Sequence, residues 1–86
     1  MMPTLLLLAA MSLQGCAPHG EIVRQLDESG YSAAAAGVAA EGALLLEIFV
    51  DETGNWIAVL TRAGDRLACV KAAGSGWTMR APGVSA

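Results

Sequence analysis

The chain has 86 residues, with five basic and eight acidic side chains and a formal net charge of −3. This length allows one domain with a modest core, and the few scattered basic residues argue against the clustered basic face of a nucleic-acid-binding protein. The apolar fraction of 55% does not by itself indicate a membrane protein, because an N-terminal leucine run and many alanines supply much of it.

The N-terminal stretch predicts a secretory signal peptide. Pro3 to Leu13 is uncharged and mostly apolar, is too short to span a bilayer as a helix, and is followed by small residues. The basic region that usually begins a signal peptide is missing, and a buried N-terminal helix of the mature fold is the alternative. We therefore expect residues 1–15 to be a signal peptide and the protein to be periplasmic or secreted.

Two fates are open for Cys16. Residues 13–16, Leu-Gln-Gly-Cys, resemble the lipobox of bacterial lipoproteins, where the cysteine sulfur is acylated and anchors the protein in the outer membrane; Gln14 is a less usual residue in that pattern. Cleavage nearby by an ordinary signal peptidase would leave a thiol instead. In that case Cys16 and Cys69, the two cysteines of an exported chain, are natural disulfide partners.

A short amphipathic helix is predicted over residues 18–29. Ile22 and Leu26 lie on one side of a 3.6-residue period, and charged residues lie on the other. Gly30 suits the left-handed position after a helix C-terminus, with Tyr31 packing back over Leu26.

Residues 32–42, SAAAAGVAAEG, are ambiguous. Alanine favours a helix, whereas Gly37 disfavours one by about 1 kcal/mol. We expect a strand over residues 34–40, because it would complete a four-stranded sheet, and a tight turn at Glu41-Gly42.

Residues 43–73 predict an antiparallel meander of three strands. Three apolar runs with alternating side chains are separated by polar, glycine-containing clusters at residues 51–54 and 62–65, and Gly54 suits a positive φ in the first hairpin. Cys69 alternates in phase with Leu67, on the side that we expect the helix to cover. The fold class is therefore α+β, with one short N-terminal helix packed on a three- to four-stranded antiparallel meander. This domain spans residues 16–77 and a flexible tail spans residues 78–86.

The mature chain is similar to a group of small uncharacterised exported proteins from alphaproteobacteria. These proteins begin with Cys-Ala-Pro and a helix, continue with a Gly-x-Trp strand and a second cysteine, and close with Gly and Trp. The matching segments here are Cys16-Ala17-Pro18, Gly54-Asn55-Trp56, Ala68-Cys69-Val70 and Gly76-Trp77. Two departures are Ile57, where threonine is usual, and the turn at residues 63–65, which lacks Pro-Asp-Gly. The resemblance implies an exported α+β domain with paired cysteines, which favours the disulfide, and it implies no reaction.

Few residues could carry chemistry. His19 is the single histidine, and a general base needs a positioned partner that the spacing does not supply. Cys16 and His19 are two metal ligands where three or four are usual, and Asp51 and Glu52 are most simply turn-forming residues. We therefore expect no enzyme activity, no metal and no cofactor.

These patterns leave three function classes. We expect an exported, non-catalytic binding or accessory module that contacts a protein partner through an exposed strand edge or through Trp56 and Trp77, although packing in the core or at the end of the sheet is the simpler explanation of both tryptophans. The alternative is an envelope lipoprotein acylated at Cys16. A bare sheet edge would favour the binding module, whereas a cleft holding His19 beside a carboxylate would favour an enzyme.

Overall fold

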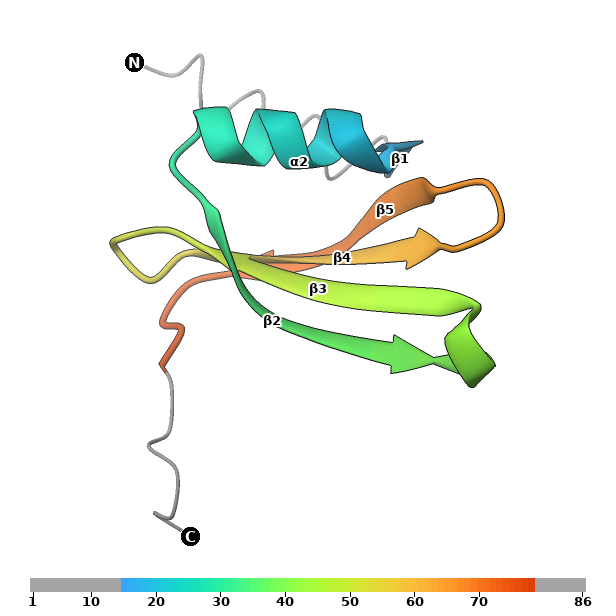
Figure 1. Ribbon diagram of the computed structural model, residues 1–86. Helices are drawn as coiled ribbons and strands as arrows, with labels where there is room; N and C mark the ends of the chain where they lie inside the picture. The colour runs from blue at the N-terminus through green and yellow to red at the C-terminus, as the bar shows by residue number, and fades with distance from the viewer. Residues whose placement is uncertain (1–14, 79–86) are drawn as a thin grey trace, which may run out of the picture.

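The computed structural model describes residues 15–78, which form one helix on a five-stranded antiparallel sheet (Figure 1). The elements in chain order are β1 (Cys16–Pro18), α2 (His19–Glu28), β2 (Ser32–Ala39), the 3₁₀ turn η1 (Ala40–Gly42), β3 (Leu44–Val50), β4 (Trp56–Arg62) and β5 (Leu67–Gly74). The strand order across the sheet is β1-β5-β4-β3-β2. The predicted signal peptide (residues 1–15) and tail (residues 78–86) lie outside the described residues except for their inner ends.

The α+β class is confirmed, but the expected number of strands is wrong. The sheet has five strands instead of three or four, because the short segment Cys16–Pro18 pairs with the start of β5. A three-residue strand carries no detectable alternation, so only its pairing identifies it. The strand expected over residues 34–40 is present as Ser32–Ala39, and the turn expected at Glu41-Gly42 is part of η1.

Helix α2 ends as its sequence predicts. Gly30 has a φ of +89°, and the Tyr31 N–H donates to the Leu26 carbonyl at 2.9 Å while the Gly30 N–H donates to the Asp27 carbonyl at 3.1 Å. This pair of bonds is the Schellman motif. The motif ends the helix and places Tyr31, which is buried, directly before β2.

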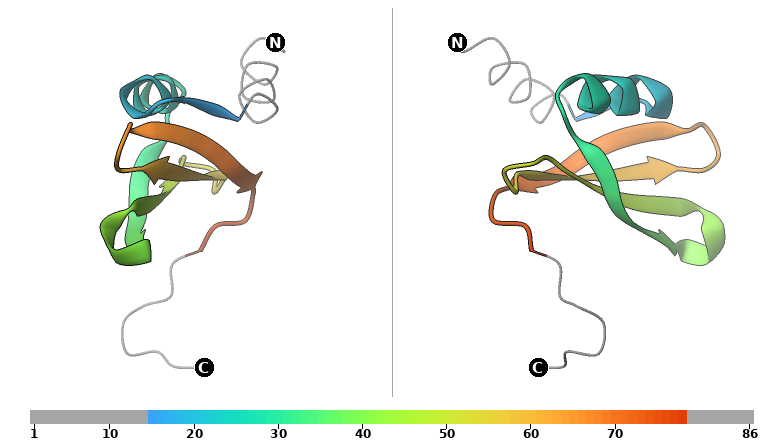
Figure 2. Two further views of the ribbon diagram at one scale, coloured as in Figure 1. Left: turned by 90° about the vertical axis from the view of Figure 1, so that its right-hand side faces the viewer. Right: turned by 60° about the vertical axis from the view of Figure 1, so that its left-hand side comes forward.

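The core lies between α2 and one face of the sheet (Figure 2). Ile22 and Leu26 of the helix are 3% and 0% exposed, and they pack against apolar side chains from the three central strands. The buried cluster consists of Ile22, Leu26, Tyr31, Phe49, Ile57, Val59 and Ala68. With so few large side chains, the fold depends on its covalent cross-link more than a larger domain would.

The cross-link is a disulfide between Cys16 and Cys69, whose Cα atoms lie 3.9 Å apart. The two residues are directly paired in the β1–β5 ladder. The expectation that Cys69 faces the helix is wrong: its neighbours Ala17 and Ala68 pack into the core, and because successive side chains of a strand alternate, the disulfide lies on the opposite face. Pairing of Ala68 with the buried Thr61, and of Cys69 with Leu60, fixes this phase.

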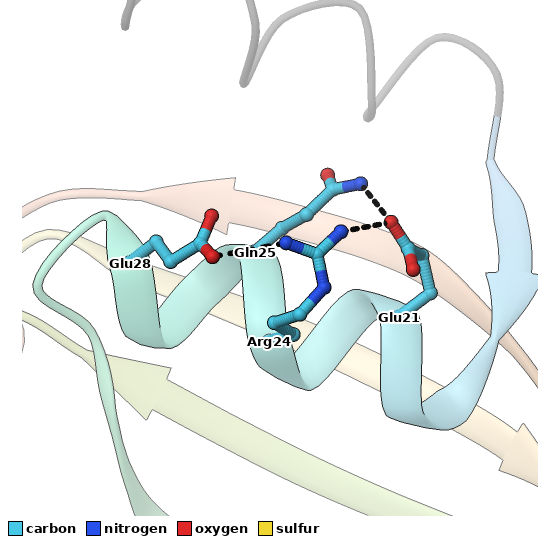
Figure 3. Close-up of polar contacts among 4 residues, drawn as sticks. All are labelled: Glu21, Arg24, Gln25 and Glu28. Atoms are coloured by element: carbon cyan, nitrogen blue, oxygen red, sulfur yellow. Dashed lines mark hydrogen bonds and ion pairs between the residues drawn. The ribbon is translucent and has the colours of Figure 1, made fainter.

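The outer face of α2 carries a local network of polar contacts (Figure 3). Arg24 pairs with Glu21 and with Glu28, and Gln25 donates to the same Glu21 carboxylate at 3.0 Å. The hydrogen bonds from Gln25 and then Arg24 hold the pKa of Glu21 below its usual value. Exposed ion pairs of this kind add little to stability.

Candidate functional site

Strand β2 forms a bare edge of the sheet. Among the residues that the structure describes, it is the last strand in the order and pairs only with β3. Seven of its eight residues are exposed, and the strand contains no charged residue and no proline. Charged side chains and prolines are features that normally prevent one sheet edge from pairing with another. The outer side of Ser32–Ala39, called the β2 edge below, lacks them.

The backbone groups of the β2 edge are available for pairing. An edge strand directs every second residue's N–H and C=O away from its one neighbour. Within residues 15–78, the segment Ser32–Ala39 makes no backbone hydrogen bond besides its ladder to β3 and no hydrogen bond to a side chain. A register shift between Ala33 and Ala35 interrupts the start of the strand. The regular part of the β2 edge is therefore Ala35–Ala39.

Exposed apolar side chains flank the β2 edge on both faces of the sheet. Val38 is 70% exposed, and Leu46 of the adjacent strand is 41% exposed. Leu46 is paired with Gly37, which has no side chain to cover it. A strand added to β2 would bring its own side chains over these positions.

The opposite edge of the sheet, unlike the β2 edge, is partly covered. Strand β1 covers the first three residues of β5 and is tied to it by the disulfide. Beyond Cys69, the Val70 N–H donates to the Gly15 carbonyl at 2.7 Å. Lys71 then occupies a bulge opposite the Ala58–Val59 step of β4. A bulge and a lysine are two of the devices that protect a sheet edge.

Trp56 and Trp77, the residues predicted for partner contact, lie together at the end of the sheet. Their ring centroids are 6.4 Å apart, and both side chains are half-buried. A Cβ on Gly74 would lie 2.9 Å from the Trp56 ring, so the glycine leaves room for that ring. The backbone N–H of Trp77 donates to the Gly54 carbonyl at 2.9 Å. The pair closes the end of the sheet, and contact of these rings with a partner stays a prediction.

His19 lies beside a carboxylate. Its Nε2 is 2.8 Å from Oε1 of Glu47 on β3, and both side chains are less than one-fifth exposed. Sequence spacing could not find this pair, because 28 positions separate the two residues and the sheet register brings them together. The pair is one element of an acid–base site. Within the described part of the chain, however, no nucleophilic side chain is hydrogen-bonded to His19.

The described residues contain neither a metal-binding cluster nor a membrane-spanning helix. Among residues 15–78, no group of three or more histidine, cysteine, aspartate or glutamate side chains is placed to hold a metal ion. In the same region no helix has the length and apolar character needed to cross a bilayer. The disulfide occupies the Cys16 sulfur, so a molecule with this bond is not acylated there.

Comparison with known proteins adds no further constraint. No protein family matches the chain, and neither a curated protein nor a solved structure is similar to it at a significant level.

Proposed function

We propose that this protein is an exported, non-catalytic binding module that captures an extended segment of a partner protein by adding it as a sixth strand at the β2 edge. The observation that carries the proposal is the eight-residue, uncharged and exposed edge strand. Backbone groups supply affinity in this mode of recognition, and side-chain pockets supply selectivity.

The apolar flanks of the edge indicate what the captured segment looks like. Val38 and Leu46 lie on opposite faces beside the edge. A partner strand with apolar residues in both phases of its alternation would cover both of them. The side chains of β2 are almost all alanine and glycine, so bulky partner residues fit without a clash. The preferred ligand is therefore an extended, apolar and weakly charged segment.

The disulfide is consistent with a protein outside the cytoplasm, because such bonds persist in oxidising compartments. Export itself rests on residues 1–15 and is tested separately: fusing residues 1–20 to a reporter that works only outside the cytoplasm should give activity. A silent reporter with normal expression would contradict export. The lipid-anchored form is the alternative, and intact-mass analysis decides it, because a lipid adds several hundred daltons to the Cys16 peptide whereas the disulfide removes about two hydrogens.

Strand addition is tested with two single variants, each of which places one lysine at one edge of the sheet. Pull-down from a periplasmic extract compares the wild type with Val38→Lys and with Ala72→Lys, an exposed position of β5. A captured protein should lose at least about tenfold in affinity for Val38→Lys, because a charged edge resists strand addition, and should bind Ala72→Lys as it binds the wild type. Equal binding to all three proteins would rule out the β2 edge as the interface.

A further inference from the structure

The sheet is covered on one side only. Figure 1 shows α2 over that side, and the core residues of β3, β4 and β5 all lie there. On the opposite side, among the residues that the structure describes, Ala58 is the one buried residue of these three strands, and the others are half-buried or exposed. This opposite side of strands β2 to β5 is called the open face below.

The open face is largely apolar. The disulfide lies on it, and so do six large aliphatic side chains in alternating positions of β3, β4 and β5: Leu44, Leu46, Ile48, Val50, Leu60 and Leu67. Two exposed cations, Arg62 and Lys71, lie toward its rim, and Arg62 is paired with Asp65. A contiguous apolar surface of this kind in a soluble protein marks an interaction site.

The open face carries both a hollow and a projecting side chain. The hollow has a volume of about 280 Å³, and the apolar part of its lining comes from Leu44, Leu60, Leu67 and the disulfide. Leu46, which is 41% exposed, projects from the same face. Two identical copies related by a two-fold axis each offer both parts, so the projection of one copy can meet the hollow of the other.

The two ends of the open face differ in charge. The loop at residues 51–54, which follows β3, contains Asp51 and Glu52, whereas the turn at residues 62–66, which follows β4, contains two arginines and one aspartate. A second copy whose strands run in the opposite direction places the acidic loop of each copy over the basic turn of the other. This complementarity favours a second copy in that orientation.

The area of the open face matches what a stable dimer needs. Strands β2 to β5 have seven or eight residues each, so their face measures about 20 by 23 Å at the usual strand spacing and rise. Side-chain relief adds to this area, and two copies would together bury about 1,000 Å² or more, as a specific interface requires. A single added helix, about 10 Å wide, would cover only half of the width.

We infer that the open face is the interface of a homodimer, in which two copies pack face to face with opposite strand directions. The two sheets then form the inner layers, and the α2 helices lie on the outside. The contact leaves the outer backbone groups of both β2 strands free. The dimer would therefore present two β2 edges, and its formation does not depend on the strand addition proposed above.

The test is sedimentation equilibrium of the full-length oxidised chain. Between about 1 and 200 μM the mass should rise from one chain to two, with a Kd of about 10 μM for an interface of this modest area. A mass of one chain at the highest concentration would overturn the inference. This measurement needs no variant, so a folding defect cannot obscure it.

Two variants with the same added charge locate the contact, and circular dichroism checks that both are folded. Leu46→Lys, on the open face, should raise the Kd at least about tenfold, whereas Val38→Lys, at the β2 edge and on the helix side, should not change it. An unchanged Kd in Leu46→Lys would overturn the inference. A raised Kd in Val38→Lys would also overturn it, because the copies would then pair through their β2 edges.

A third variant tests the orientation of the two copies. Glu52→Lys, in the exposed loop after β3, should raise the Kd about threefold at low ionic strength, because it places a cation over the basic turn of the other copy. An unchanged Kd would overturn the opposite strand directions.

Discussion

At one edge of the sheet β1 is three residues long and is bonded through sulfur to β5, whereas at the other edge β2 presents eight residues without a charge. The protein thus covers one edge with a short, disulfide-bonded strand followed by a bulge that carries a lysine. Strand β2 also has a register shift near its start, but its regular part, Ala35–Ala39, carries no charge and is left open. An open edge is an aggregation hazard for any small exported domain. The β2 edge is open although the opposite edge is protected, and this contrast supports a role of the β2 edge in binding.

The largest expected effect comes from removing the disulfide that ties β1 to β5. Replacement of Cys16 and Cys69 by serine should lower the free energy of unfolding by about 4 kcal/mol, because the bond closes a loop of 53 residues that the unfolded chain would otherwise be free to open. Denaturant unfolding measures the loss, and amide exchange should show β1 opening before β2. A loss below about 1 kcal/mol, or earlier opening of β2, would contradict the contrast between the edges.

The central hairpin provides a reference that belongs to neither edge. Gly54 has a φ of +91°, as its position in the loop predicts, so Gly54→Val should lower stability by about 1 kcal/mol or more because a β-branched residue is strained there. Ser75→Val, in the exposed segment after β5, should change little. Equal shifts in the thermal melts of the two variants would contradict the positive φ at Gly54.

A row of residues on the helix side joins the two edges: Ala17, Ala68, Thr61, Leu45 and Val38 are successive register partners. Thr61→Val, in the middle of the row, should raise the free energy of unfolding by about 1 kcal/mol. The reason is that the buried Thr61 hydroxyl has no hydrogen-bond partner within residues 15–78, and such a group destabilises the fold. Chemical unfolding measures the gain. A loss of stability would mean that the hydroxyl has a structural partner.

The smallest expected effect separates the edges by pH. The Arg62 side chain, followed by the Leu67 backbone N–H, holds the pKa of Asp65 below its usual value. This carboxylate therefore stabilises the turn before β5 above its unfolded pKa, and the effect is lost as the pH falls through the folded pKa. The β2 edge has no ionisable side chain. The Leu67 amide shift should therefore titrate with a midpoint below that of an ordinary aspartate, and Arg62→Gln should raise that midpoint. An unchanged midpoint would mean that Arg62 does not act on Asp65.

Much of the fold could be predicted from local patterns. The period of Ile22 and Leu26 and the glycine at position 30 predict α2 and its end. The turn clusters at residues 51–54 and 62–65 predict the boundaries of β3, β4 and β5. These features depend on residues close together in the sequence, where spacing alone carries the information.

The features that could not be predicted depend on register. Strand β1 is identified only by its pairing with β5, and the pairing of Ala68 with Thr61 and of Cys69 with Leu60 puts the disulfide on the face away from the helix. The His19–Glu47 pair has the same origin.

The disulfide also makes a closed ring of the backbone from Cys16 to Cys69. A protease that cuts one peptide bond in this ring, for example in η1 or in the loop at residues 51–54, opens the ring but releases no fragment. The nicked molecule keeps every strand attached and gains only the mass of one water, so gel electrophoresis without a reductant would not separate it from the intact chain. A single cut can sever only the segments outside the ring, which are the residues before Cys16 and the residues after Cys69.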